Sequence, residues 1–194
     1  MTEKKRMFIA VNFPENLQET VEGFALNLQR KLDPDARSFK WVEPRNIHLT
    51  LQFLGDVDMG LLPKLAGGLS GAFSDIPSFH VQVAGCGAFP SLLRPRIIWA
   101  GMRHGADGFR ALHSATLRVT EDFGFVPETR PFKAHMTLAR LRRSKQTPDI
   151  REEIENTSHE VVGECQIERV VLMASELKPN GPIYSILDSF DLGN

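Results

Sequence analysis

Hydrophobic and polar positions alternate along this chain with two different periods. Between residues 15 and 31 the apolar side chains are spaced three or four positions apart, at Leu17, Val21, Phe24, Ala25 and Leu28. This spacing predicts an amphipathic helix. Between residues 48 and 53, Leu49, Leu51 and Phe53 alternate with polar neighbours, which predicts a strand with one buried face that ends at Gly55 and Asp56.

The same two periods predict the other elements. Further strands are expected at 7–13, 79–84, 96–100, 132–139, 161–177 and 183–192, with a short extended piece at 39–42. Further helices are expected at 61–73, which three glycines weaken, and at 109–123 and 149–154. Helices alternate with strands and hairpin-like strand pairs, so we expect a mainly antiparallel α+β fold. No long polar linker divides the sequence, and residues 1–194 are expected to form one domain.

One four-residue pattern occurs twice. Residues 48–51 read His-Leu-Thr-Leu, and residues 135–138, 87 positions later, read His-Met-Thr-Leu. Each copy lies in a predicted strand and follows a segment that contains proline, EPRNI before the first and RPFKA before the second. The repeat suggests an internal duplication in which each half contributes one strand to a common cleft.

Strand geometry places the polar residues of each copy together. Residues i and i+2 of a strand point to the same face, so His48 shares a face with Thr50, and His135 shares a face with Thr137. The apolar residues between them point to the opposite face and can anchor each strand in a core. The same parity would add Gln52 to the first polar face and Lys133 to the second.

Two imidazoles and two hydroxyls in one cleft suit phosphodiester hydrolysis or transesterification without a metal. A neutral imidazole can accept a proton from the attacking oxygen, and a protonated one can donate a proton to the leaving oxygen, because the ordinary pKa of histidine is about 6.5. The hydroxyls can donate hydrogen bonds to the non-bridging phosphoryl oxygens. The activity should therefore show a bell-shaped pH dependence whose apparent pKa values belong to the pair.

A structural interpretation competes with this one. A single His-x-Thr in a strand is more often a histidine that faces solvent than a catalytic residue. Two copies with the same apolar spacing and similar flanking turns favour the catalytic interpretation. The remaining histidines show no such pairing: His80, His104, His113 and His159.

The charge pattern adds a candidate anion site. The chain has 23 Lys and Arg against 24 Asp and Glu, a net charge of −1, which argues against a protein that coats long duplexes. Residues 128–145, however, hold six basic side chains and one acidic one around the second motif. A solvated basic face is the usual meaning of such a run. Here Arg130, Lys133 and Arg140 are candidate phosphate ligands, and Arg140 would need a bulge or a long reach to enter the cleft.

Several classes of function are excluded or disfavoured. Cys86 and Cys165 form neither a CxxC pair nor a disulfide framework, and each is expected to pack as a small apolar residue. No HxH, HExxH, GxxxxGK[ST] or GxGxxG pattern occurs, so we expect no metal and no cofactor. No apolar run suggests a signal peptide or a membrane span, and a cytoplasmic, soluble monomer is expected.

At these residues the chain resembles the two-histidine (2H) phosphoesterases, and in particular the RNA 2′,3′-cyclic phosphodiesterases, also called 2′–5′ RNA ligases. The similarity includes MFIAVNFP, WVEPRNIHLTLQFLGDV, GAFPSLLRPRIIWAGM, GFVPETRPFKAHMTLAR and SELKPNGPIYSIL, which span most of the chain in the expected order. Met136 stands where Leu is common in the family, a mild departure.

The resemblance implies a bilobal fold with two mainly antiparallel sheets flanked by helices, pseudo-two-fold symmetric about a central cleft that holds both motifs. It implies hydrolysis of a 2′,3′-cyclic phosphate at an RNA end to a 2′-phosphate. His48 would be the proton donor to the 3′ oxygen, His135 the proton acceptor that activates water, and Thr50 and Thr137 the ligands of the phosphoryl oxygens. In reverse, the site could join a cyclic end to a 5′-hydroxyl.

Two other functions remain open. Some proteins with this fold bind AMP-like nucleotides, although the presence of two complete motifs argues against a simple binder. The same chemistry could also act on a small substrate, such as a cyclic phosphate of ADP-ribose or a 2′–5′ oligoadenylate. For an RNA end, including a tRNA half, the terminal base is expected to stack on Phe13, Phe53 or Phe89.

Overall fold

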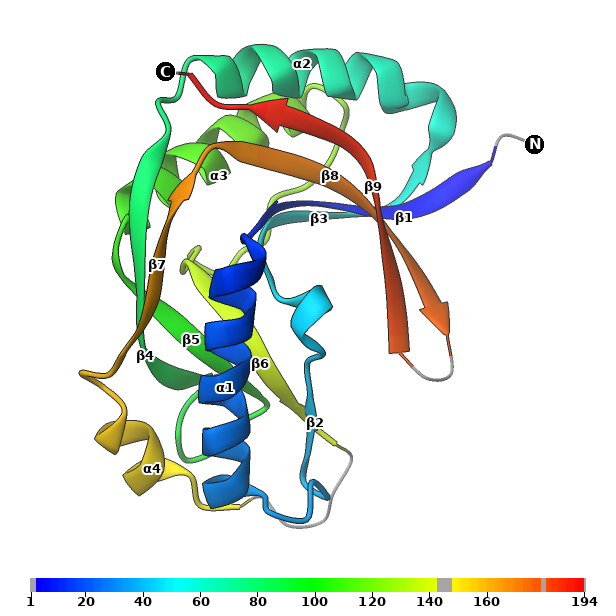
Figure 1. The fold of residues 1–194 in the computed structure, drawn as a ribbon. Coiled ribbons are helices and arrows are strands. Elements are labelled where there is room, and N and C mark those ends of the chain that lie inside the picture. Colours follow the sequence, from blue (N-terminus) through cyan, green and yellow to red (C-terminus); the bar gives the residue numbers. More distant parts are fainter. Residues whose placement is uncertain (1–2, 143–147, 179–180, 194) are drawn as a thin grey trace.

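The structure, a computed structural model, describes residues 3–142, 148–178 and 181–193. Its strands form two antiparallel sheets, as expected for the α+β class (Figure 1). The first sheet has the order β3-β1-β8-β9, with bounds His48–Asp58, Lys4–Asn12, Arg169–Lys178 and Gly181–Asp191. The second has the order β2-β6-β5-β4-β7, with bounds Phe39–Trp41, His135–Leu141, Ile97–His104, Phe79–Phe89 and Val161–Ile167.

Four α-helices cover these sheets in the described part of the chain: α1 (Glu15–Leu32), α2 (Leu62–Ser74), α3 (Ala106–Glu121) and α4 (Arg151–Asn156). The helices α2 and α3 pack on each other and contact β9 and β3 of the first sheet, whereas α1 lies along β7 of the second (Figure 1). Short 3-10 turns at Pro44–Asn46 and Met59–Leu61 precede β3 and α2.

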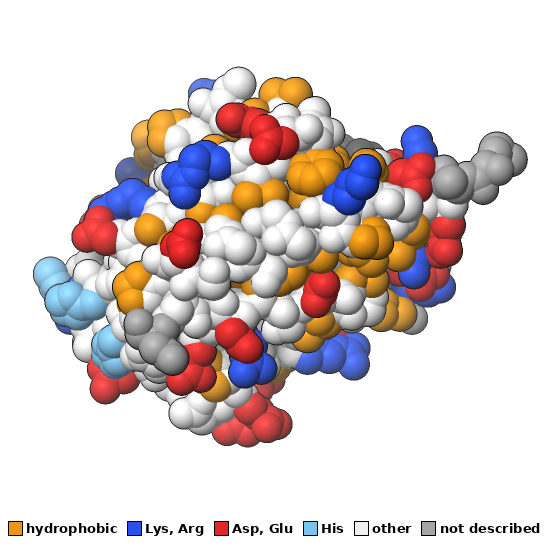
Figure 2. Space-filling view, turned by 90° about the horizontal axis from the view of Figure 1, so that it is seen from above, with side chains coloured by type: hydrophobic (Ala, Val, Ile, Leu, Met, Phe, Trp, Pro, Cys, Tyr) orange, Lys and Arg blue, Asp and Glu red, His pale blue; other side chains and the backbone are white. Residues whose placement is uncertain are grey.

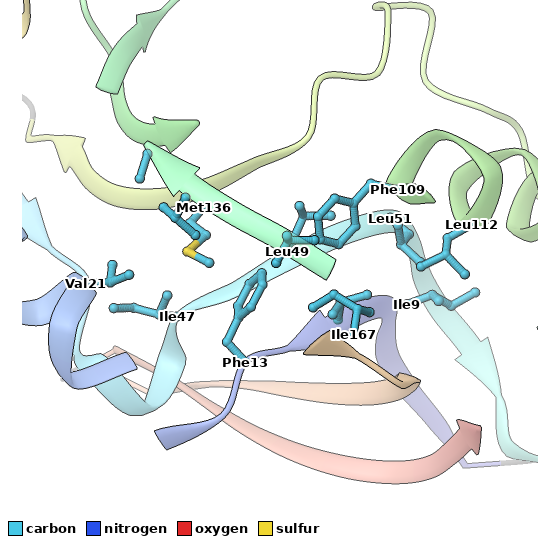
Figure 3. Close-up of a cluster of buried hydrophobic side chains, with 14 of the residues drawn as sticks. Ile9, Phe13, Val21, Ile47, Leu49, Leu51, Phe109, Leu112, Met136 and Ile167 are labelled. Atoms are coloured by element: carbon cyan, nitrogen blue, oxygen red, sulfur yellow. The ribbon is translucent and has the colours of Figure 1, made fainter. Parts of the chain in front are cut away.

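The apolar residues of the two motifs lie in the core, as the strand parity predicts. Leu49 and Leu51 of β3 pack with Phe109 and Leu112 of α3, and Met136 of β6 belongs to the same buried cluster (Figure 3). The cluster thus joins residues from both sheets and from the helices between them. Since β3 and β6 also contact each other, the two motif strands are held side by side with their polar faces turned away from this core.

The predicted strand 161–177 is wrong as a single element. It is two strands, β7 and β8, and Glu168 separates them where the chain passes from the second sheet into the first. Polar and apolar residues alternate from Glu164 to Ile167, whereas residues 170–174 form one continuous buried apolar run. Only Glu168 and Arg169 lie between these two apolar stretches, and the predicted strand runs through this short polar break.

Other boundaries also differ from those expected. The strand β3 continues through Gly55 to Asp58, because Gly55 adopts a positive φ of 71° that keeps the backbone paired with β1. The strand β6 begins only at His135, and β4 runs on to Phe89. The residues between the paired positions Lys178 and Gly181, part of the predicted PNGP turn, lie outside the described residues.

The surface agrees with the near-zero net charge. On the face seen in Figure 2, acidic and basic side chains are interspersed, so no single sign of charge dominates there. Within the described residues, no helix has the length and apolar character needed to cross a membrane.

Candidate active site

Each motif strand contains a β-bulge at the last residue of its motif. Between β1 and β3, Ile9 pairs with Gln52 and Ala10 with Thr50, which leaves Leu51 as the extra residue. The bulge in β6 lies at the matching place in the repeat, at Leu138, where the register with β5 shifts. A bulge of one residue reverses the alternation of faces beyond it.

The bulges decide which residues join the motif faces. In β6, the bulge brings Arg140 onto the face of His135 and Thr137. This is the bulge that the strand parity required for Arg140 to enter the cleft. In β3, Phe53 comes onto the face of His48 and is 51% exposed. Phe53 and Arg140 hold equivalent places in the repeat, so one half presents an aromatic ring where the other presents a cation.

The predicted place of Gln52 on the polar face is wrong. The bulge turns this side chain inward, where it is 5% exposed and its Oε1 accepts a hydrogen bond of 2.7 Å from Thr120 Oγ1 on α3. Gln52 therefore links β3 to a helix behind the sheet.

Both motifs line one cleft of about 690 Å³. His48 and Thr50 enter it from the first sheet, and His135, Thr137 and Arg140 from the second. The other sides of the cleft are formed by the segment from β2 to the 3-10 turn after it, and by the described ends of β8 and β9. These parts contribute Lys40, Trp41, Arg45, Lys178, Ile183 and Tyr184 among others.

The backbone fixes the tautomer of both histidines in the same way. His48 Nδ1 lies 2.7 Å from the carbonyl oxygen of Asn46, and His135 Nδ1 lies 2.7 Å from that of Lys133. A carbonyl oxygen can only accept, so Nδ1 carries the hydrogen in both rings. Nε2 is consequently the nitrogen at which each imidazole can take up or release a proton.

Aromatic rings hold each imidazole in place. His48 lies 5.1 Å from Phe8 and 5.3 Å from Tyr184, the latter at an interplanar angle of 90°. His135 lies 4.9 Å from Phe89 at 89°. These contacts, tilted for Phe8 and edge-to-face for Tyr184 and Phe89, restrict rotation of the imidazoles, so the hydrogen bond at Nδ1 and the direction of Nε2 are both maintained.

Burial lowers the pKa of both histidines. The pKa of His48 falls from 6.5 to about 4, mainly through burial and further through the positive charges of Arg140 and His135, although the Asn46 carbonyl opposes the shift. The pKa of His135 is lowered by burial and by Arg140 and Lys133. In the free protein near pH 7 both rings are therefore neutral, and a bound phosphate anion would restore their affinity for a proton.

This shift predicts a loss of stability in acid. Since the pKa of His48 is about 4 in the folded chain and 6.5 in the unfolded chain, only the unfolded chain binds this proton as the pH falls from 6.5 to 4. The free energy of unfolding should then fall by about 3 kcal/mol over this interval. Urea unfolding at several pH values measures it, and H48Q should show a correspondingly smaller fall; an equal fall in both proteins would contradict the assignment.

The three candidate cationic ligands occupy different places. Arg140 lines the cleft with the histidines. The Nζ of Lys133 lies 3.9 Å from the centroid of the Trp99 ring and lines a second, adjacent pocket. Arg130 is 83% exposed and pairs with Glu128 at 3.2 Å. Roles for Lys133 and Arg130 in substrate binding remain predictions; Arg143 and Lys145 of the same basic run lie outside the described residues.

The three phenylalanines predicted to stack on the terminal base also occupy different places in the structure. Phe13 is 4% exposed in the core, so its prediction as a stacking residue is wrong. Phe89 packs against His135, and Phe53 is exposed on the motif face. The sequence reasoning missed Tyr184, which lines the cleft beside His48; the one signal for it was its place in the segment IYSIL.

The other histidines and the two cysteines lie outside the lining of the cleft. Among the residues that the structure describes, no group of three or more His, Cys, Asp or Glu side chains could hold a metal ion. Burial raises the pKa of both cysteines to about 11, and Cys86 Sγ lies 2.7 Å from Thr157 Oγ1. His113 stacks on Phe132 at 4.2 Å, and His80 is 3.7 Å from Glu164.

A duplicated His-x-Thr in one cleft between two antiparallel sheets is the site of a two-histidine phosphoesterase, and comparison with known proteins agrees. A family model described as LigT like Phosphoesterase matches residues 14–99 and 101–184. The chain therefore belongs to the LigT-like phosphoesterases of the 2H superfamily, as predicted, and is a phosphodiesterase.

Individual relatives match over nearly the whole chain. Proteins named RNA 2′,3′-cyclic phosphodiesterase from Methanothermobacter thermautotrophicus and Thermus thermophilus are 31% and 34% identical over 97% and 96% of this chain, and over 100% and 90% of their own lengths. A crystal structure of a protein from Thermus thermophilus covers 97% of this chain and 99% of its own, with 30% identity and a TM-score of 0.79. Escherichia coli LigT in complex with 3′-AMP has the same fold, with a TM-score of 0.77 and 24% identity over 99% of this chain and 100% of its own. The predicted fold class is confirmed.

Proposed function

We propose that this protein hydrolyses the terminal 2′,3′-cyclic phosphate of RNA to a 2′-phosphate by general acid–base catalysis with two histidines. The observation that carries the proposal is the convergence of two imidazoles, each with its hydrogen on Nδ1, on one cleft that also holds two threonine hydroxyls and Arg140. Relatives named RNA 2′,3′-cyclic phosphodiesterase support the substrate.

The proposed roles follow the chemistry of the ring opening. His135 Nε2 accepts a proton from water as the new bond from the water oxygen to phosphorus forms. His48 Nε2 donates a proton to O3′ as the bond from phosphorus to O3′ breaks, so the phosphate stays on O2′. Thr50 and Thr137 donate hydrogen bonds to the non-bridging oxygens, and Arg140 balances the charge that builds on them.

The same ring opening can take place with a different nucleophile. If the 5′-hydroxyl of a second strand replaces water, the same bond to O3′ breaks and a 2′–5′ phosphodiester forms. We propose this ligase activity as the minor reaction, because water is present at about 55 M and a free 5′-hydroxyl end is scarce by comparison.

The lowered histidine pKa values set the expected pH profile. For a cyclic mononucleotide, kcat/KM should be bell-shaped with its maximum below pH 6.5, because kcat/KM follows the protonation of the free enzyme. The kcat profile should lie at higher pH, since the bound phosphate raises both pKa values. Stopped-time assays from pH 4 to 8 at constant ionic strength measure both. A kcat/KM optimum at about pH 7.5 or above would contradict the assigned histidine pKa values.

The substrate class is tested with a graded set of substrates. We expect opening of 2′,3′-cyclic AMP, of a dinucleotide and of a tRNA half that ends in a cyclic phosphate, all unchanged by EDTA. Binding of AMP without turnover of any cyclic phosphate would instead support a nucleotide-binding module. Turnover confined to ADP-ribose cyclic phosphate or 2′–5′ oligoadenylate would support an enzyme for small substrates.

A further inference from the structure

A second pocket, of about 460 Å³, lies beside the catalytic cleft on the same face of the second sheet. Trp99 forms part of its wall and pairs with Thr137 across β5 and β6, which places the two side chains on one face. The ring centroids of Trp99 and His135 are 6.4 Å apart. The pocket therefore begins next to the second catalytic histidine.

The pocket has a strongly positive lining. Arg103, Arg110 and Lys133 line it together with the hydroxyl residue Ser158, and no acidic side chain belongs to its wall among the residues that the structure describes. Lys133 lies beside the cleft, since its Nζ is over the Trp99 ring, which is itself next to the ring of His135. A phosphate group held here would lie close to a phosphate held by the two motifs.

The three cations are held by neighbours that leave donors for a ligand. Arg103 donates one hydrogen bond, of 3.1 Å, from Nη2 to the carbonyl oxygen of His159, and Arg110 pairs through Nη2 with Asp107. A guanidinium has five N–H donors, so each arginine keeps further donors for an anion.

Lys133 is placed by a cation–π contact. Its Nζ lies over the Trp99 ring, whose centroid is 3.9 Å away. The ring can lie flat on the sheet because Gly87 and Gly101 face it, and a Cβ at these positions would come within 2.3 Å and 3.2 Å of ring atoms. The ammonium group has three N–H donors. One side of the group faces the ring, so N–H donors on its other side can face a ligand.

The chemistry of the proposed substrate says what such a ligand would be. The cyclic phosphate terminates the 3′ end, so the RNA strand continues from it only in the 5′ direction. Any further phosphate is therefore the phosphodiester on the 5′ side of the terminal nucleotide, a monoanion. We infer that the second pocket is a subsite for this phosphodiester, held by Arg103, Arg110 and Lys133 while the terminal nucleotide occupies the cleft; the inference rests on the proposed function.

The inference is tested by comparing two substrates in one set of variants. For a dinucleotide that ends in a cyclic phosphate, R103Q/R110Q should lower kcat/KM at least about tenfold, mostly through KM, because two charged donors are lost. For the cyclic mononucleotide, which lacks the second phosphate, kcat/KM should stay within about twofold. R118Q, which removes an exposed arginine elsewhere on α3, is the matched control and should change neither value.

A second variant is expected to act in the opposite direction. D107N removes the acidic partner of Arg110, so it should raise kcat/KM for the dinucleotide and leave the mononucleotide unchanged. A purely structural role for this ion pair would not give a gain for one substrate alone.

The outcomes separate the inference from the proposed function. If the wild-type protein opens neither substrate, the proposed function fails. If it opens both, and R103Q/R110Q either leaves the dinucleotide unaffected or slows both substrates equally, the proposed function stands and the subsite is refuted.

Discussion

Replacement of either motif histidine, in H48A or H135A, is expected to lower kcat for a 2′,3′-cyclic nucleotide by at least about 10³-fold. Loss of a general acid or base costs about 10²- to 10⁴-fold, and neither role can be filled by the threonines or Arg140 in the same cleft. In the proposed mechanism the two rings act in one step, so the double variant should be little slower than the slower single variant.

The control for this experiment is H104A, since His104 is an exposed histidine at the end of β5, outside the cleft lining. It should keep the wild-type rate. Circular dichroism and thermal unfolding would establish that H48A and H135A are folded. Retention of more than about a tenth of the wild-type kcat in either one would contradict a mechanism that needs both rings.

Replacement of Arg140 by glutamine should lower kcat/KM by about 10²-fold, because a cationic donor aimed at a developing charge contributes on this scale. Arg140 reaches the cleft through the bulge at Leu138. Its charge adds to the lowering of the pKa of His48 and His135 that burial causes, and opposes the rise that burial causes in the pKa of Tyr184. These three effects place its guanidinium near the point where the two motifs meet.

The pH profile distinguishes this role from a structural one. R140Q should shift both limbs of the kcat/KM profile to higher pH, because the positive charge that depresses the histidine pKa values is gone. R140K should recover part of the rate and most of the profile. R94Q, which removes an exposed arginine outside the cleft lining, should match the wild type. A slower R140Q with an unchanged profile would contradict direct contact with the site.

The sequence predicted most of the helices and strands, and the shared face of the histidine and threonine in each motif, because both depend on the local period of apolar residues. A strand with apolar Leu49 and Leu51 must bury one face, so His48 and Thr50 must share the other. The crossing at Glu168 was not predicted, since only two polar residues, Glu168 and Arg169, interrupt the apolar pattern there and the choice of sheet depends on partners far along the chain.

The bulges at Leu51 and Leu138 mark where sequence reasoning about the site fails. Parity alone places Gln52 on the polar face and keeps Arg140 off it, and a bulge reverses both assignments. A bulge arises from the match between two strands, so the sequence of one strand does not reveal it. Tyr184 was missed for a related reason, because the β8–β9 hairpin reaches the cleft only through the order of strands in the first sheet.

The most direct test of the central claim is the ³¹P NMR spectrum of the product that the wild-type protein forms from a dinucleotide with a terminal 2′,3′-cyclic phosphate, in the presence of EDTA. The account predicts a 2′-phosphomonoester as the product of hydrolysis, with H48A and H135A leaving the cyclic phosphate intact. A 3′-phosphomonoester, or opening that requires a metal, would contradict it.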